Sequence, residues 1–191
     1  MLARVLALGA VLVASASVLP AQDPIKRTAG EPLGRFAARV LPKGTELAHQ
    51  PLEGRFGPGA GNVVLLFRQT GAVDSNYTGW VLVPANAASR ATYTKFPLPK
   101  MREIPAHFEI SVEAVFFANA DSDAAPELIV LYSYHRNGSQ DDDSTGCYVY
   151  HWTGKEFVSM EALERELAGF KSAAAIRAKL ARARLKPNGH L

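Results

Sequence analysis

The sequence predicts a mainly β fold of the α+β class, either a small antiparallel β-sheet or a partial propeller-like domain, with a helix at its C-terminal end. Three observations support this prediction. Short apolar, β-branched runs recur between turn-forming segments, residues 108–116 alternate between apolar and polar, and helical spacing begins only after residue 159. Strands followed by a terminal helix are typical of an antiparallel sheet with the helix packed on one face.

The first 21 residues are predicted to be a secretory signal peptide. Arg4 precedes the apolar run 5–13, and small residues follow, ending in Leu19-Pro20-Ala21. A charged start, a short apolar run and a small-residue cleavage site define such peptides. Cleavage after Ala21, which we favour over Ala16, leaves 191 − 21 = 170 residues, enough for one domain with its own core. An uncleaved anchor is the alternative, but the run is shorter than the ~20 residues that span a bilayer.

The mature chain divides into three predicted parts: a polar, flexible N-terminus over 22–35, a β domain over 36–158, and a helical segment over 159–186. The glycine-rich stretch 54–62 is expected to be a loop. The candidate strands are residues 36–41, 63–67, 80–83, 92–98, 108–116, 128–134, 147–152 and 157–158.

Two strand patterns carry most of this prediction. VVLLF (63–67) and the run starting at Leu128 are continuously apolar, which is typical of strands buried on both faces. The strand 108–116 instead has period two, which predicts a single buried face. The residues expected on that face are Phe108, Ile110, Val112, Ala114 and Phe116.

The C-terminal segment has helical spacing. Ser159 can cap a helix, Gly169 weakens it, and Ser172 can cap a second helix that runs to about residue 185. Residues 171–191 contain six basic and no acidic side chains. These charges form either a solvated helix face or a contact with an anionic envelope surface, with Ile176 and Leu180 on the apolar side.

The loop between strands 108–116 and 128–134 carries the best chemical signal. Side-chain oxygens of Asn119, Asp121, Asp123 and Glu127 occupy its first, third, fifth and ninth positions, and the carbonyl of Ala125 is available at the seventh. Calcium needs six to eight oxygen ligands in a small volume, so the loop predicts a calcium site. The alternative is that the aspartates cap N–H groups of a β-turn and bind nothing.

This loop, with the strand that follows it, resembles the FG-GAP/VCBS-type repeats of exported and surface proteins. The resemblance covers about residues 112–158, and it implies a calcium-binding loop and an antiparallel blade of the kind that tandem copies build into propellers. Asn119 replaces an aspartate of the family pattern and Ala124 replaces a glycine. The residues that carry the resemblance are Asn119, Asp121, Asp123, Pro126, Glu127, Leu128, Val149, Tyr150, Trp152, Gly154 and Phe157.

Other constellations argue against common activities. A net charge of +3 does not indicate nucleic-acid binding, and Cys147, the only cysteine, is expected to be a buried small hydrophobe. No nucleophile motif is present, and the five histidines lack zinc-ligand spacing, so zinc is not expected.

We therefore expect a secreted or periplasmic, non-catalytic binding or structural domain with an envelope glycan or protein as partner. The alternative is an enzyme or assembly factor acting on cell-envelope or surface polysaccharide. The aromatic strand residues either stack a ligand or pack in the core. These residues are Tyr132, Tyr134, Tyr148, Tyr150 and Trp152.

Overall fold

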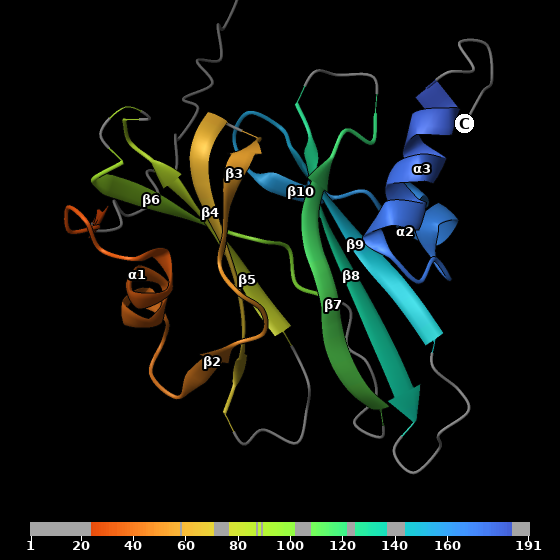
Figure 1. The fold of residues 1–191 in the computed structure, drawn as a ribbon, viewed down its shortest axis with the longest axis horizontal. Helices are drawn as coiled ribbons and strands as arrows, with labels where there is room; N and C mark the ends of the chain where they lie inside the picture. Colours follow the sequence, from red (N-terminus) through yellow and green to blue (C-terminus); the bar gives the residue numbers. More distant parts are fainter. Residues whose placement is uncertain are drawn as a thin grey trace, which may run out of the picture.

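The computed structural model describes residues 24–57, 59–70, 77–86, 88, 90–101, 108–121, 125–136 and 144–184. Within these ranges the chain forms four layers: helix α1, a six-stranded sheet, a four-stranded sheet, and helices α2 and α3 (Figure 1). The predicted signal peptide lies outside the described residues. The prediction of a mainly antiparallel β fold with a C-terminal helix is confirmed.

The six-stranded sheet has the order β1-β6-β5-β4-β2, with β3 also paired to β4, and all its pairs are antiparallel. Strands β2 and β3 occupy successive parts of the same edge of β4. The strands are β1 (Ile25–Lys26), β2 (Thr45–Leu47), β3 (Leu52–Phe56), β4 (Gly59–Gln69), β5 (Tyr77–Pro84) and β6 (Thr92–Pro97).

The four-stranded sheet is an antiparallel meander of order β10-β9-β8-β7. Strands that are neighbours in the chain are neighbours in this sheet. Its strands are β7 (Phe108–Ala118), β8 (Glu127–Arg136), β9 (Ser144–Trp152) and β10 (Phe157–Ser159).

The apolar runs of strands β4 and β8 are buried on both faces of their sheets, which explains why these runs are continuous. Val64 and Leu66 of β4 meet Leu128 and Val130 of β8 in the central core between the sheets. The alternate residues face outward into two further cores. Val63 and Leu65 pack with α1 (Leu33–Val40), whereas Ile129 and Leu131 pack with α2 (Glu161–Leu167) and α3 (Ala173–Arg184).

The predicted first strand over 36–41 is wrong, because residues 36–40 belong to helix α1 and Leu41 is its C-cap. Leu33, Phe36, Ala37 and Val40 lie at helical spacing, and all four pack in the outer core of the six-stranded sheet. The described part of segment 22–35, expected to be flexible, contains strand β1 and the beginning of α1.

The predicted loop over 54–62 is also wrong, because it is a β-hairpin between β3 and β4. Gly57 forms the turn with φ of +51°, a conformation that glycine adopts without strain. Buried Asn62 donates through Nδ2 to the carbonyl oxygens of Phe56 (2.6 Å) and Gly59 (3.1 Å). The glycines therefore shape an irregular hairpin that is closed by a side-chain amide.

A β-bulge in β7 changes the face that its side chains occupy. Val112 pairs with Tyr132 but Ala114 pairs with Leu131, so Glu113 is the extra residue. Before the bulge Val112 faces the central core; after it Ala114 and Phe116 face the helices. The prediction that residues 108–116 share one buried face is therefore wrong beyond Val112.

The C-terminal helices agree with the sequence pattern. Gly169, with φ of +86°, separates α2 from α3, and the Oγ of Ser172 accepts the N–H of Ala175 at 3.2 Å. The predicted cap at Ser159 is wrong, because Met160 is the N-cap of α2 and no side chain caps the helix; Ser159 instead donates to Oε1 of Glu164 at 2.5 Å. The same Oε1 accepts the N–H of Val149, which attaches α2 to the edge of β9. Across the described ranges, no helix has the length and hydropathy that crossing a membrane requires.

One prediction concerns the place where β3 approaches β7. A Cβ on Gly54 would lie 2.2 Å from the ring of Phe117, which itself stacks on Phe56 with a centroid distance of 4.2 Å. We expect Gly54→Ala to destabilise the fold by roughly 1–3 kcal/mol, because a ring in a packed core must move.

The matched control is Gly34→Ala in α1, where a Cβ meets nothing within 4 Å. We expect it to be neutral or stabilising by up to about 1 kcal/mol, because alanine favours the helix. Urea denaturation of both variants measures the difference. Equal stability of the two variants would contradict the close approach of β3 to β7.

Candidate metal centre

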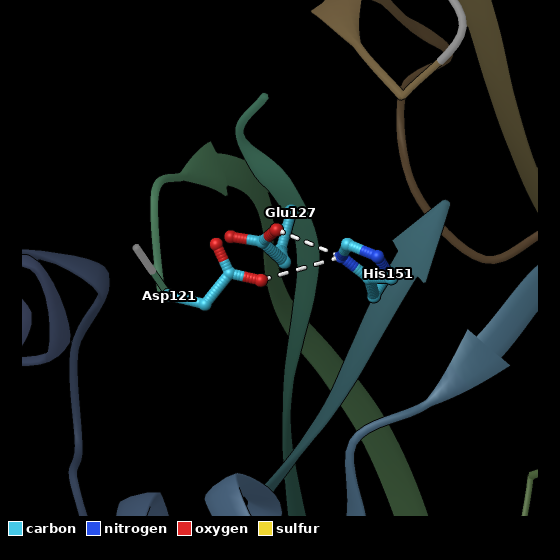
Figure 2. Close-up of side chains that lie close together, drawn as sticks. All are labelled: Asp121, Glu127 and His151. Atoms are coloured by element: carbon cyan, nitrogen blue, oxygen red, sulfur yellow. Dashed lines mark hydrogen bonds and ion pairs between the residues drawn. The ribbon is translucent and has the colours of Figure 1, made fainter. Parts of the chain in front are cut away.

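Three potential metal ligands come together where β7, β8 and β9 meet (Figure 2). Asp121 lies in the connection after β7, Glu127 is the first residue of β8, and His151 is the next-to-last residue of β9. One potential ligand atom from each residue lies within 4.8 Å of the other two. The cluster is formed from three separate places in the chain.

Strand pairing explains why Glu127 and His151 meet. Leu128 pairs with Tyr150 in the antiparallel register of β8 and β9. One step further along this register, Glu127 is opposite His151. Ile129 and Val149, two residues away on each strand, face the helices, so Glu127 and His151 occupy that side of the sheet.

The distances show how the three side chains share one point. The Nδ1 of His151 lies 3.3 Å from Oε1 of Glu127 and 3.4 Å from Oδ2 of Asp121 (Figure 2). The other carboxylate oxygen of Glu127, Oε2, accepts the N–H of Ala120 at 2.6 Å. The imidazole nitrogen thus stands between two carboxylates, one of which is anchored to the loop backbone.

The burial of the cluster is uneven. The side chain of Glu127 is 1% exposed, while those of Asp121 and His151 are 28% and 26% exposed. Ala118 pairs with Glu127 across β7 and β8, and Ala120 donates its N–H to the Glu127 carboxylate. One side of the cluster is therefore closed by the protein, and the other is accessible to solvent.

This environment disfavours the charge on Glu127. Burial raises the pKa of its carboxyl, and the nearby Asp121 raises it further. The N–H of Ala120 and the ring of His151 act against this shift. A bound cation would relieve both the burial of the charge and the repulsion between the two carboxylates.

The predicted calcium ligands are only partly assembled in the cluster. Asp121 and Glu127 belong to it, and Asn119 and Ala125 lie half-buried in the same connection. Asp123 lies outside the described residues. The loop spacing does not predict His151 as a ligand, because it is 24 residues from Glu127 in sequence. Only the β8–β9 register could have indicated it.

The aromatic strand residues contribute to the core. Tyr132 stacks on Tyr148 with a centroid distance of 4.8 Å, and Tyr148 is 6.3 Å from Tyr150. Tyr148 and Tyr150 are only 5% and 1% exposed. Of the two expectations, core packing agrees with the structure, and an open aromatic face for a sugar does not.

The structure also shows the surroundings of Cys147, Ile176 and Leu180, which the sequence pattern singled out. Cys147 is buried, and burial raises the pKa of its thiol to about 12, as expected for an inert hydrophobe. Ile176 and Leu180 are buried against the sheet and are not available to enter a membrane surface.

Comparisons with known proteins add no assignment: no family model matches the chain, and neither a curated protein nor a solved structure matches it. The resemblance to FG-GAP/VCBS repeats therefore remains a prediction from the motif residues alone.

A prediction follows from the burial of Glu127. Its pKa is higher in the folded chain than the usual 4.5, so the native state keeps this proton to higher pH than the unfolded state does. The resulting cost to stability is absent at low pH, grows between the unfolded and folded pKa values, and is complete above the folded one. We expect Glu127→Gln, which removes the charge, to be more stable than the native chain at pH 7 without metal, with the difference vanishing toward pH 4.

Thermal melts in a metal chelator between pH 4 and pH 8 measure this effect. Glu156→Gln, which changes an exposed carboxylate in the β9–β10 turn, is the matched control and should leave the pH profile unchanged. A Glu127→Gln variant that is less stable than the native chain at every pH would contradict the account.

Proposed function

We propose that the chain is an exported, non-catalytic binding or structural β domain that holds a divalent cation at Asp121, Glu127 and His151. The observation that carries the proposal is the convergence of two carboxylates and one imidazole from three strand ends within 4.8 Å. These are common protein ligands for divalent metals. The cation would join the β7–β8 connection to the end of β9.

The burial of Glu127 supports a bound ion over a solvated acidic loop. An ionised carboxylate with 1% of its side chain exposed is costly unless it is paired. Its described partners are the N–H of Ala120, its own backbone N–H and the imidazole of His151, and a second carboxylate lies beside it. A cation supplies the missing positive charge.

The motif resemblance supports the same location. Its acidic part ends at Glu127 and its aromatic part, from Val149 to Trp152, lies in β9. Because β8 and β9 are paired, the two parts of the motif are neighbours in space. A cation bound at this position would therefore stabilise the acidic and the aromatic parts of the motif together.

A melting experiment tests cation binding. We expect at least one ion among calcium, magnesium, manganese and zinc to raise the Tm of the metal-free protein, because a ligand that binds only the native state stabilises it. At a free concentration of 100 Kd the gain is about 2.7 kcal/mol, roughly 5–10 °C for a domain of this size.

Asp121→Asn and Glu127→Gln should lose most of that shift, while the control Glu156→Gln should retain it. Asp121 is partly exposed, so Asp121→Asn tests the site without changing a buried side chain. The proposal is wrong if each of the four ions shifts the Tm of the native chain no more than it shifts the Tm of Asp121→Asn.

Export is tested separately. In a bacterial host with its native N-terminus, the protein should be recovered outside the cytoplasm with Gln22 as its first residue, because the small residues ending at Ala21 suit signal cleavage. Mass spectrometry of cell fractions measures both properties. An uncleaved chain confined to the cytoplasm would refute this part of the proposal.

A further inference from the structure

We propose that the ion at this centre is a transition-type divalent metal, zinc in particular, and that calcium is not its preferred ligand. This inference rests on the proposed function and narrows it. It reverses the expectation from the loop alone, which contains only oxygen ligands.

The donor atoms provide the first argument. Calcium is bound by six to eight oxygens, whereas imidazole nitrogen suits zinc and its neighbours in the first transition row. In the cluster, Nδ1 of His151 is the atom that both carboxylates approach. Any ion held by all three side chains must therefore accept a nitrogen ligand.

The second argument concerns Glu127. Its Oε2 is committed to the N–H of Ala120 at 2.6 Å, which leaves Oε1 for the ion. Calcium sites of the loop type rely on a glutamate that binds through both oxygens. A carboxylate that offers one oxygen while the other is hydrogen-bonded is suited to a metal with few ligands, such as tetrahedral zinc.

The distances provide the third argument. Two ligands bound to tetrahedral zinc at about 2.0–2.2 Å lie roughly 3.3–3.6 Å apart. The two Nδ1-to-oxygen distances are 3.3 Å and 3.4 Å. Both exceed the 2.7–3.2 Å typical of N–H···O hydrogen bonds, and one imidazole N–H cannot point at two acceptors. Both Nδ1-to-oxygen distances therefore match those between two ligands of a shared tetrahedral metal.

The surroundings are consistent with such a site. Glu127 is 1% exposed, Ala118 pairs with it across β7 and β8, and Ala120 donates to it, so the ion would contact a carboxylate in a low-dielectric environment that strengthens their attraction. Asp121 and His151 are partly exposed, so an ion can enter from solvent. Three protein ligands leave a further coordination position for water or a partner group.

The test is a binding measurement with the metals themselves. Zinc, cobalt and calcium are titrated into the metal-free protein by calorimetry, and the visible absorption of bound cobalt reports its coordination. We expect zinc to bind at least 100-fold more tightly than calcium, and cobalt to give the intense visible bands of a low-coordinate site that zinc then abolishes.

Variants assign the binding to this centre. His151→Gln, which keeps the size of the side chain but replaces the nitrogen ligand, should weaken zinc binding at least 100-fold while leaving calcium binding unchanged. His151→Asp should shift the preference toward calcium. Glu156→Gln should bind zinc like the native chain, and the Tm of each variant without metal confirms that it is folded.

The outcomes separate this inference from the proposed function. Calcium binding as tight as zinc binding, unaffected by His151→Gln, would overturn the inference and leave the cation-binding function in place. Zinc binding that survives both His151→Gln and Asp121→Asn would place the metal elsewhere and overturn the inference. The absence of binding by all three metals would overturn the inference, and it would refute the cation-binding function as well if magnesium and manganese also fail to raise the Tm of the native chain.

Discussion

Strand β8 is buried on both faces, and the rest of the structure is arranged around this constraint. Residues Leu128 to Leu131 are at most 1% exposed and point alternately into the central core and into the core under α2 and α3. Each such side chain contributes about 1.5–3 kcal/mol by its burial. A polar group within this run would face an apolar core. Polar side chains that could bind a ligand are therefore confined to the ends of the strand, and Glu127 is its first residue.

The bulge at Glu113 connects this constraint to the candidate centre. It moves Ala114, Phe116 and Ala118 to the helix side of β7, where they face the outward residues of β8. Ala118 pairs with Glu127, so the chain leaves β7 on the side that the carboxylate occupies. The connection can then return Asp121 and the N–H of Ala120 to Glu127.

Much of the fold can be predicted from local pattern. The strands around 63–67, 108–116 and 128–134 are evident because short apolar, β-branched runs between turns favour buried strands, and Gly169 with Ser172 marks the break between the helices. The sequence pattern fails to predict the structure where tertiary contacts determine the local conformation. Helix α1 is only eight residues long and depends on packing against the six-stranded sheet, and the β3–β4 hairpin tolerates its glycines because Asn62 closes it. The bulge leaves no signal in the alternation itself.

Only part of the candidate centre can be predicted from the sequence, because local patterns do not show which strands pair. Asp121 and Glu127 lie in one short connection, so their spacing is visible in the sequence, whereas His151 is brought to them by the pairing of β9 with β8. The sequence does not predict zinc because the histidines lack local zinc spacing; in the structure, the nitrogen ligand comes from a different strand.

The most direct measurement is anomalous X-ray diffraction at the zinc edge, from crystals of the protein grown with one equivalent of zinc. The account predicts one strong peak within bonding distance of Nδ1 of His151, Oε1 of Glu127 and a carboxylate oxygen of Asp121. An empty cluster with zinc bound elsewhere would contradict it.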